Sequence, residues 1–268
     1  MTVIHAAVLG LVQGVTEFLP VSSSAHLILV RAFLGWDAEQ LGLSFDIACH
    51  LGTLVAILIY FRRELVQILA ATPRMFRLPA TGDARYAQLI VVGTLPIVAA
   101  GALYTPAVEE ALRTARVTIV TLAAGAVAFL WADRIGAQTR TDDSLTFGEA
   151  FLLGCAQAGA LVPGVSRSGA VIVVAIFMGL RRASSARFAF LLGIPAILAA
   201  GAKGALELGP QGPAGDALGI FVAGMLVSAV VGYVTVKYFI RYLSRHSLRA
   251  FAWYRLGLAS LVAIWVLK

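Results

Sequence analysis

Charged residues are scarce in this chain of 268 residues, since Asp, Glu, Lys and Arg together make up 13% of it, whereas hydrophobic residues make up 60%. Soluble globular domains carry about 25% charged residues, so an ordinary water-exposed surface is excluded. The composition therefore predicts an integral membrane protein.

Cysteine is equally scarce, because the chain has only Cys49 and Cys155. Both stand in apolar sequence without the spacing of metal ligands, which predicts small buried side chains and no disulfide framework. The N-terminal segment also lacks a basic stretch ahead of its apolar residues, so we expect no cleaved signal peptide.

Acidic residues are outnumbered, and the formal net charge is +7. The basic residues are scattered between apolar segments rather than clustered with aromatic residues, so no nucleic acid is expected as a partner. Their distribution favours the positive-inside rule, with the arginine-rich segment 62–85 in the cytoplasm. Counting spans from there predicts that both termini are extracytoplasmic.

Near-continuous apolar stretches have the length of roughly 17 to 25 residues that a helix needs to cross a bilayer. These six predicted spans cover residues 43–61, 87–104, 117–132, 188–206, 218–240 and 250–267. Together they predict one all-α membrane domain over residues 1–268.

An internal repeat connects the two halves of the chain. A shift of 144 residues aligns 6–35 with 150–179 without a gap, with identical residues at 11 of 30 positions. The matches include Gln13 with Gln157, two serines and two glycines, which an apolar composition does not supply by chance. We place repeat 1 at about 1–132 and repeat 2 at about 145–268.

Each aligned copy is interrupted by Pro, Gly and Ser, which leaves apolar halves too short to span a bilayer. The segments 5–36 and 148–180 are therefore predicted to be re-entrant helix pairs. Three predicted spans separate them, and because this number is odd, the repeats should be inverted. Each half would then contain one re-entrant pair and three transmembrane helices, with the two tips meeting near the membrane midplane.

Polar residues gather at both predicted tips. Glu17 and Gln13 are spaced i, i+4, so they share a helix face beside Ser22-Ser23-Ser24 and His26, while the second tip carries Arg167 between Ser166 and Ser168. Ionisable groups at membrane depth are costly and mark functional sites. Helix-start amides and a guanidinium suit phosphate, and a carboxylate with an amide oxygen suits Mg²⁺. The cluster predicts phosphoryl transfer or hydrolysis, with His26 for proton transfer and Ser23 as nucleophile or phosphate ligand.

Simpler interpretations compete with this one. Arg167 could be a structural counter-ion of Glu17, and His26 could make only a helix contact. Asp46 and His50 favour an interfacial role, and Arg181 with its neighbour at 182 a role in topology. Inverted repeats with broken helices also occur in secondary transporters, so a flippase for a prenyl phosphate lipid is the alternative function.

The segments QGVTEFLPVSSSAH (13–26), FDIACHLGT (45–53) and PGVSRSGA (163–170) carry a family resemblance. In order, spacing and chain length, the sequence resembles the bacterial undecaprenyl pyrophosphate phosphatases, a family also linked to bacitracin resistance. It departs from the family's usual residues at Gln13, Ala25 and Val171, where Glu, Gly and Thr are common.

The resemblance implies an enzyme that converts undecaprenyl pyrophosphate to undecaprenyl phosphate and phosphate in the bacterial plasma membrane, recycling the carrier lipid for peptidoglycan and other envelope polymers. It implies an active site that opens on the extracytoplasmic side and a divalent cation, Mg²⁺ or Ca²⁺, held by Glu17 and Gln13. A homodimer is left open. The implied catalytic residues are Glu17, Ser23, His26 and Arg167, and the implied substrate-binding residues are Gln13, Ser22, Ser24, Ser166, Ser168 and Gly169.

Overall fold

The computed structural model describes residues 2–36, 42–76, 79–112, 114–208 and 216–266, and no β-strand occurs in these ranges. The predicted all-helical fold is confirmed. The α-helices are α1 Val3–Thr16, α2 Ser23–Leu34, α3 Gly42–Tyr60, α4 Arg62–Ala71, α5 Gly82–Leu103, α6 Pro106–Leu112, α7 Ala115–Ile135, α8 Phe147–Ala158, α9 Arg167–Phe177, α10 Arg182–Leu208, α11 Asp216–Leu243 and α12 Arg249–Val266.

Four helices of the described chain are long and apolar enough to cross a membrane, namely α5, α7, α10 and α11. A fifth span results if α3 and the following helical segment, bent by 81° at their junction, count as one. The predicted spans 43–61 and 250–267 correspond to α3 and α12, and neither meets that criterion alone. The helices fit a multi-pass membrane protein, while the number six stays a prediction.

Two short helix pairs, α1–α2 and α8–α9, carry the repeated sequence. Each break contains a proline, Pro20 or Pro163, and the residue before a proline avoids helical backbone. The pairs also begin alike, because Thr2 and Thr146 cap α1 and α8 in the same capping-box arrangement. The first residues of α1 and α8, and those of α2 and α9, differ by the same 144 residues as the aligned sequence.

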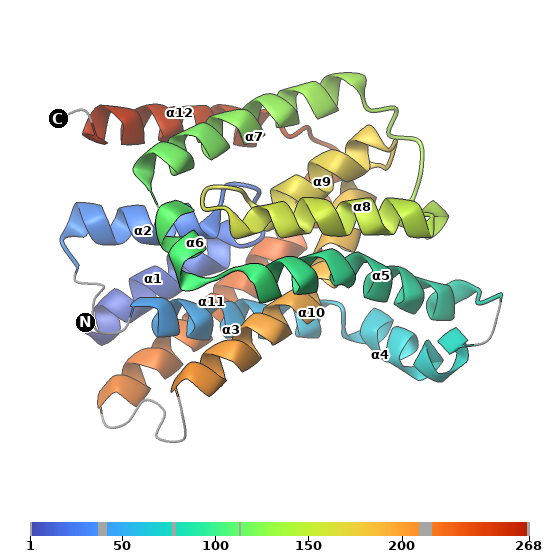
Figure 1. Ribbon diagram of the computed structural model, residues 1–268, viewed down its shortest axis with the longest axis horizontal. Coiled ribbons are helices and arrows are strands. Elements are labelled where there is room, and N and C mark those ends of the chain that lie inside the picture. Colours follow the sequence, from blue (N-terminus) through green and yellow to red (C-terminus); the bar gives the residue numbers. More distant parts are fainter. Residues whose placement is uncertain (1, 37–41, 77–78, 113, 209–215, 267–268) are drawn as a thin grey trace.

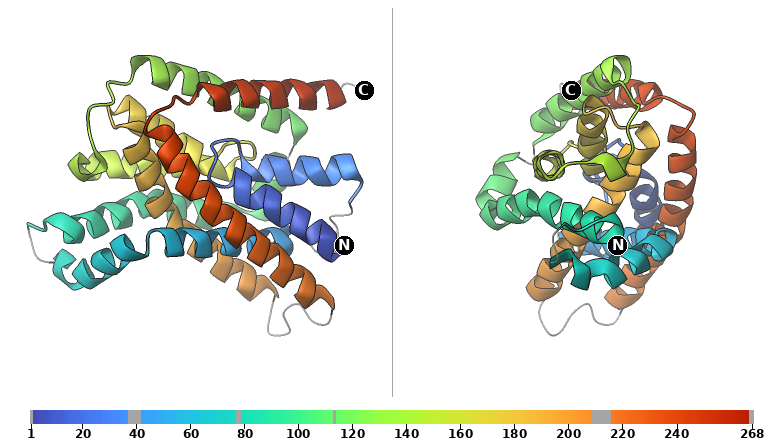
Figure 2. Two further views of the ribbon diagram at one scale, coloured as in Figure 1. Left: turned by 180° about the vertical axis from the view of Figure 1, so that it is seen from behind. Right: turned by 90° about the vertical axis from the view of Figure 1, so that its right-hand side faces the viewer.

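The two pairs extend in opposite directions along the molecule (Figure 1). α1 and α2 lie between the middle and the end that carries both chain termini, and α8 and α9 lie between the middle and the opposite end. The view from behind agrees (Figure 2). Each pair packs against a helix of the other half: α1 packs against α11, and α8 packs against α5. The two breaks are thereby held close together.

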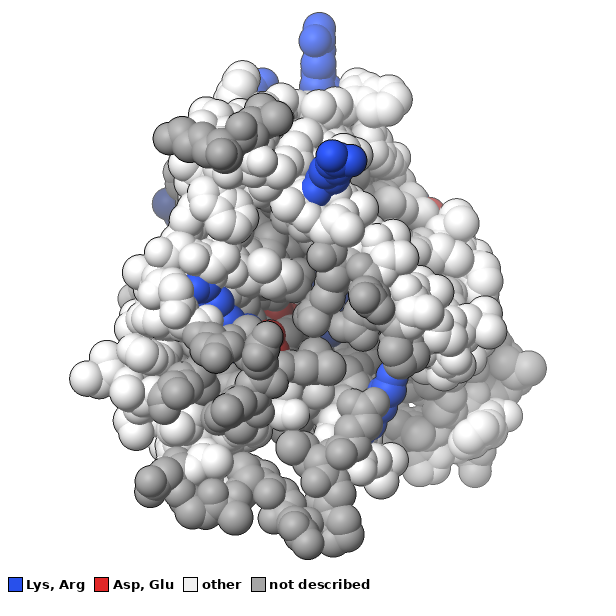
Figure 3. Space-filling view, turned by 60° about the vertical axis from the view of Figure 1, so that its left-hand side comes forward, with Lys and Arg blue, Asp and Glu red and all other residues white. Residues whose placement is uncertain are grey.

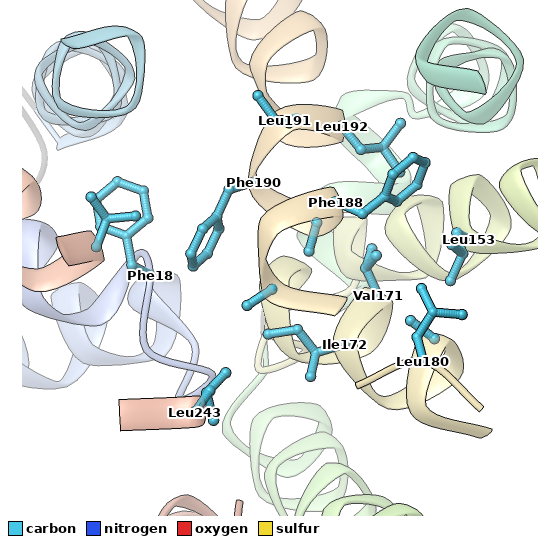
Figure 4. Close-up of a cluster of buried hydrophobic side chains, with 14 of the residues drawn as sticks. Phe18, Leu153, Val171, Ile172, Leu180, Phe188, Phe190, Leu191, Leu192 and Leu243 are labelled. Carbon is cyan, nitrogen blue, oxygen red and sulfur yellow. The ribbon is translucent and has the colours of Figure 1, made fainter. Parts of the chain in front are cut away.

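The hydrophobic core surrounds α10, which lies between the two pairs (Figure 4). Phe190 of α10 meets Phe18 of the first break edge-on, with ring centroids 5.4 Å apart, and Val171 and Ile172 of α9 are fully buried nearby. In a bilayer, where lipid is as apolar as these side chains, such packing stabilises the fold through van der Waals contacts rather than through removal of apolar surface from water. The packing therefore fixes both breaks against α10.

The two cysteines differ in burial. Cys49 of α3 is buried, as predicted, whereas Cys155 of α8 is exposed, so the prediction is wrong for Cys155. The side of α8 that carries Cys155 is not covered by another element of the described chain. In a membrane, lipid would cover this apolar side.

Candidate active site

An ion pair joins the two breaks at the centre of the molecule. Glu17, in the turn that follows α1, accepts a hydrogen bond through Oε1 from Nη2 of Arg167, the first residue of α9. Both side chains are largely shielded, with 5% of Glu17 and 22% of Arg167 exposed. The predicted meeting of the two polar clusters is confirmed for Glu17 and Arg167. In this structure Arg167 is the counter-ion of Glu17, as the simpler interpretation expected.

The second oxygen of Glu17 lies among several hydrogen-bonding groups. Ser23 Oγ donates to Oε2 over 2.7 Å, and Gln13 Nε2 donates to the same oxygen over 3.0 Å. A hydroxyl within hydrogen-bond reach of a carboxylate has the geometry that a serine nucleophile and its base require. Glu17 therefore connects Arg167, which can bind an anion, to Ser23, which can attack one.

His50 of α3 also faces this carboxylate. Its Nε2 lies 3.4 Å from Glu17 Oε2, and its Nδ1 lies 2.8 Å from the backbone oxygen of Asp46. A carbonyl oxygen can only accept, so Nδ1 carries a proton and Nε2 is left to face Glu17. Asp46 is fixed in turn by a bidentate pair with Arg31, at 2.6 and 3.0 Å. Asp46 and His50 therefore contact charged groups of the protein, and their expected interfacial role stays a prediction.

His26, the histidine singled out from the sequence, makes different contacts. Its Nδ1 lies 2.7 Å from the backbone oxygen of Ser22, and its Nε2 lies 2.7 Å from the hydroxyl of Tyr254 in α12. The two rings are stacked, with centroids 5.6 Å apart. Both ring nitrogens of His26 are thus occupied within the protein, which fits a residue that positions the first break.

A cavity of about 540 Å³ adjoins the ion pair. Five of the site residues predicted from the sequence line it: Glu17, Ser23, Ser24, Ser166 and Arg167. The other five, Gln13, Ser22, His26, Ser168 and Gly169, are not among its lining residues. Figure 3 shows acidic atoms at the bottom of a hollow on a face with few, separate Lys and Arg side chains.

The rest of the cavity wall is mainly apolar. It combines small and aliphatic side chains of α5 and α10, including Ile97, Ala102, Ile197 and Ala200, with Lys203 of α10. A cavity that is polar at one end and apolar along its length suits a ligand with an ionic head and a hydrocarbon chain.

The starts of α2 and α9 contribute unequally to the polar end. α2 begins at Ser23 and its N-cap, Ser22, has a φ of 74° and makes no capping hydrogen bond. α9 begins at Arg167, and Ser166 caps it by accepting from the Gly169 amide over 3.1 Å. Because this amide donates to the cap, the Gly169 amide is not free to bind an anion in this structure.

Arg255 of α12 holds the two breaks together, although the sequence analysis did not single it out. Its side chain is almost completely buried, and its guanidinium donates to Pro20 O of the first break and Gly164 O of the second, both over 3.2 Å. It also donates to the backbone oxygens of Thr121 and Leu122 in α7. The available signal was a single arginine inside the apolar stretch 250–267.

The residues expected to hold a divalent cation do not form a preformed site. Within the described ranges, no three acidic, histidine or cysteine side chains converge. Both oxygens of Glu17 are engaged, one by the guanidinium of Arg167, and Gln13 Oε1, although buried and unpaired, does not border the cavity. Glu17 is the one carboxylate among the described residues that line the cavity, and a guanidinium bound to it opposes a resident cation, so the cation stays a prediction.

The chain is similar to known proteins along nearly its whole length. Residues 6–261 match the family model described as bacitracin resistance protein BacA. Proteins named undecaprenyl-diphosphatase are similar throughout. The one from Rubrobacter xylanophilus is 45% identical over 98% of both chains, and that from Chromohalobacter salexigens is 42% identical over 98% of both. One from Moorella thermoacetica is 38% identical over 98% of this chain and 97% of its own.

Proposed function

Because the chain belongs to the BacA family of bacitracin resistance proteins, we propose that it hydrolyses undecaprenyl pyrophosphate to undecaprenyl phosphate and inorganic phosphate. The observation that carries the proposal is the cavity, which joins Glu17, Ser23 and Arg167 to an apolar wall from α5 and α10. The pyrophosphate would bind at the polar end and the first isoprene units along the apolar wall.

Arg167 is the residue proposed to bind the pyrophosphate. A guanidinium pairs with two phosphoryl oxygens at once, so the substrate competes with Glu17 for it. Ser24 and Ser166 border the same end of the cavity and add hydroxyl donors. When the substrate takes the guanidinium, Glu17 loses its counter-ion and becomes a stronger base for the Ser23 hydroxyl, which lies 2.7 Å away.

In the proposed reaction, Ser23 Oγ gives its proton to Glu17 and attacks the terminal phosphorus. The bond between that phosphorus and the bridging oxygen breaks, and undecaprenyl phosphate leaves. Water then hydrolyses the phosphoserine and releases phosphate. If Ser23 is only a phosphate ligand, water attacks directly, and no phosphoenzyme forms. A phosphoenzyme trapped on Ser23 distinguishes the first course from the second.

His50 is the histidine we propose to contact the substrate or move a proton, since it borders the cavity beside Glu17. His26 is proposed to position the first break. Gln13 would orient Glu17 through its amide, and Ser22, Ser168 and Gly169 would shape the helix starts. A divalent cation belongs to this proposal only as the counter-ion with which the pyrophosphate substrate enters.

The proposed architecture is an inverted repeat of two re-entrant pairs and six spans in a bacterial plasma membrane, with both termini and the cavity opening extracytoplasmic. Two observations support the inversion. The pairs α1–α2 and α8–α9 point in opposite directions, and each packs against a helix of the other half, α11 or α5. The relatives carry the name of a hydrolase, so transport of a prenyl phosphate is not proposed as the activity.

The test is release of phosphate from undecaprenyl pyrophosphate by the purified protein in detergent, where a flippase would have no activity. Arg167→Ala should lower kcat/KM by about 100- to 1,000-fold, the usual effect of removing a group that stabilises developing charge. Arg249→Ala, at an exposed arginine of α12, is the matched control and should change little. Near-normal hydrolysis by Arg167→Ala would refute the proposed role of Arg167.

A further inference from the structure

Gln157 of α8 is a buried amide without a hydrogen-bond partner. None of its surface is exposed, and neither Oε1 nor Nε2 has a partner among the described residues. An unpaired buried polar group destabilises a fold, and native proteins contain few of them. A buried amide that makes no hydrogen bond within the protein does not stabilise the fold, so it is available to bind a ligand.

The repeat explains why this amide has no internal partner. Gln13, at the equivalent position of the first copy, donates to the carboxylate of Glu17, four residues later. The residue four positions after Gln157 is Leu161, which has no acceptor in its side chain. The amide is therefore common to both copies, whereas the carboxylate that binds it occurs only in the first.

Gln157 borders the cavity together with Ser166 and Arg167. Its amide group has two donor hydrogens and one acceptor oxygen, so Nε2 can donate to a phosphoryl oxygen that also contacts the guanidinium. A cation and a hydroxyl already lie on that wall. A phosphate group matches these three donors, the guanidinium, the hydroxyl and the amide.

We propose that Gln157 is a substrate-binding residue whose Nε2 donates to the pyrophosphate held by Arg167. The identity of this ligand rests on the proposed function. Since the amide exposes no surface in the free protein, this binding requires a neighbouring part of the wall to move when the phosphate enters. The bound substrate then supplies the hydrogen bond that the fold does not.

A structural role for Gln157 predicts the opposite effect on stability. If the amide fixed α8 through an internal water, Gln157→Leu would lower the thermal unfolding temperature. If the amide is reserved for the substrate, leucine of similar size removes an unpaired polar group, and the unfolding temperature stays the same or rises.

The experiment compares wild type, Gln157→Leu and Gln157→Glu, with Gln67→Leu at an exposed position of α4 as control. Thermal unfolding is measured with and without farnesyl methylenebisphosphonate, whose P–C–P bridge resists hydrolysis, and kcat/KM is measured with undecaprenyl pyrophosphate. We expect Gln157→Leu to keep its stability, to lose most of the stabilisation by the analogue and to lose about 10- to 100-fold in kcat/KM. Gln157→Glu, which keeps the side-chain size, should lose as much, because its charge repels phosphate.

The proposal is overturned if Gln157→Glu is stabilised by the analogue as wild type is, if the free Gln157→Leu protein unfolds at a lower temperature, or if the analogue fails to stabilise wild type. The proposed function fails separately, if wild type binds the analogue through Gln157 but releases no phosphate from undecaprenyl pyrophosphate.

Discussion

Replacement of Arg255 by methionine should loosen the two breaks from each other and slow hydrolysis. The guanidinium is the hydrogen-bond donor that Pro20 O and Gly164 O share, and methionine fills much of the same volume without donating. Two buried carbonyls left unpaired cost about 1–3 kcal/mol each, or about 2–6 kcal/mol together. This is an upper limit, because removal of a buried cation relieves its desolvation. The backbone oxygens of α7 keep their helical partners.

The effect on activity should exceed the effect on stability. A shift of about 1 Å between Ser23 and Arg167 can cost about 100-fold in rate, because catalysis depends on their alignment. We therefore expect Arg255→Met to lower the thermal unfolding temperature by several degrees in detergent, and kcat by about 100-fold. Phosphate release from undecaprenyl pyrophosphate at saturating substrate measures kcat.

Two companion variants test the cause. Gly125→Ala keeps the charge of Arg255, but its Cβ would lie 2.3 Å from Nη2 and displace the guanidinium. It should lower kcat in the same direction. Arg249→Met, at the exposed start of α12, should leave both measurements unchanged. If Arg255→Met unfolds at the wild-type temperature and keeps kcat within about threefold, the breaks do not depend on Arg255, and the reasoning is refuted.

Other predictions concern the histidines, helix packing and pH. His50→Asn should lower kcat by about 100-fold, the usual contribution of a proton-transfer residue, at an unchanged unfolding temperature, whereas His26→Asn should lower both; the reverse pattern would return the chemistry to His26. Gly52 of α3 packs closely against α11, and Gly52→Ala would place a Cβ 2.2 Å from a backbone oxygen of α11, so it should destabilise the protein by about 1–3 kcal/mol. Gly257→Ala, with open space around it, should not destabilise the protein. Equal unfolding temperatures of the two variants would contradict the α3–α11 packing. The hydrogen bond from Arg140 lowers the pKa of Glu149 to about 2. The contribution of Glu149 to the stability of the protein is therefore complete above the ordinary pKa near 4.5 and is lost as pH falls toward 2. The difference in unfolding temperature between wild type and Glu149→Gln should therefore shrink below pH 4.5, and a constant difference would exclude this pair as the cause.

The scarcity of charge predicts the all-helical membrane fold, and the interrupted apolar segments of the repeat predict the two broken helix pairs. Both features can be predicted because they depend on residues that are neighbours in the sequence. The contact between Glu17 and Arg167 was also predictable, since the aligned copies place polar clusters at both breaks. The described helices meet the criteria for four or five spans, so the number six and the orientation of the termini stay predictions.

The contacts of His50 and Arg255 were not predictable in the same way. His50 reaches Glu17 only because α3 packs beside the first break, and its spacing from Asp46 fits an interfacial pair equally well. Arg255 binds backbone oxygens of three segments, which leave no pattern in the sequence. Which face of a short helix borders a cavity depends on packing, and this decided that Ser23 and Ser24 line the cavity while Ser22 does not.

The central claim is that Glu17 and Arg167, from opposite breaks, act in one pyrophosphate site. The most direct test is kcat/KM for undecaprenyl pyrophosphate in wild type, Glu17→Gln, Arg167→Ala and the double variant. Residues that act as a unit are strongly non-additive, so the double variant should be about as slow as the slower single variant. If its loss instead equals the product of the two single losses, the residues act independently, and the claim is contradicted.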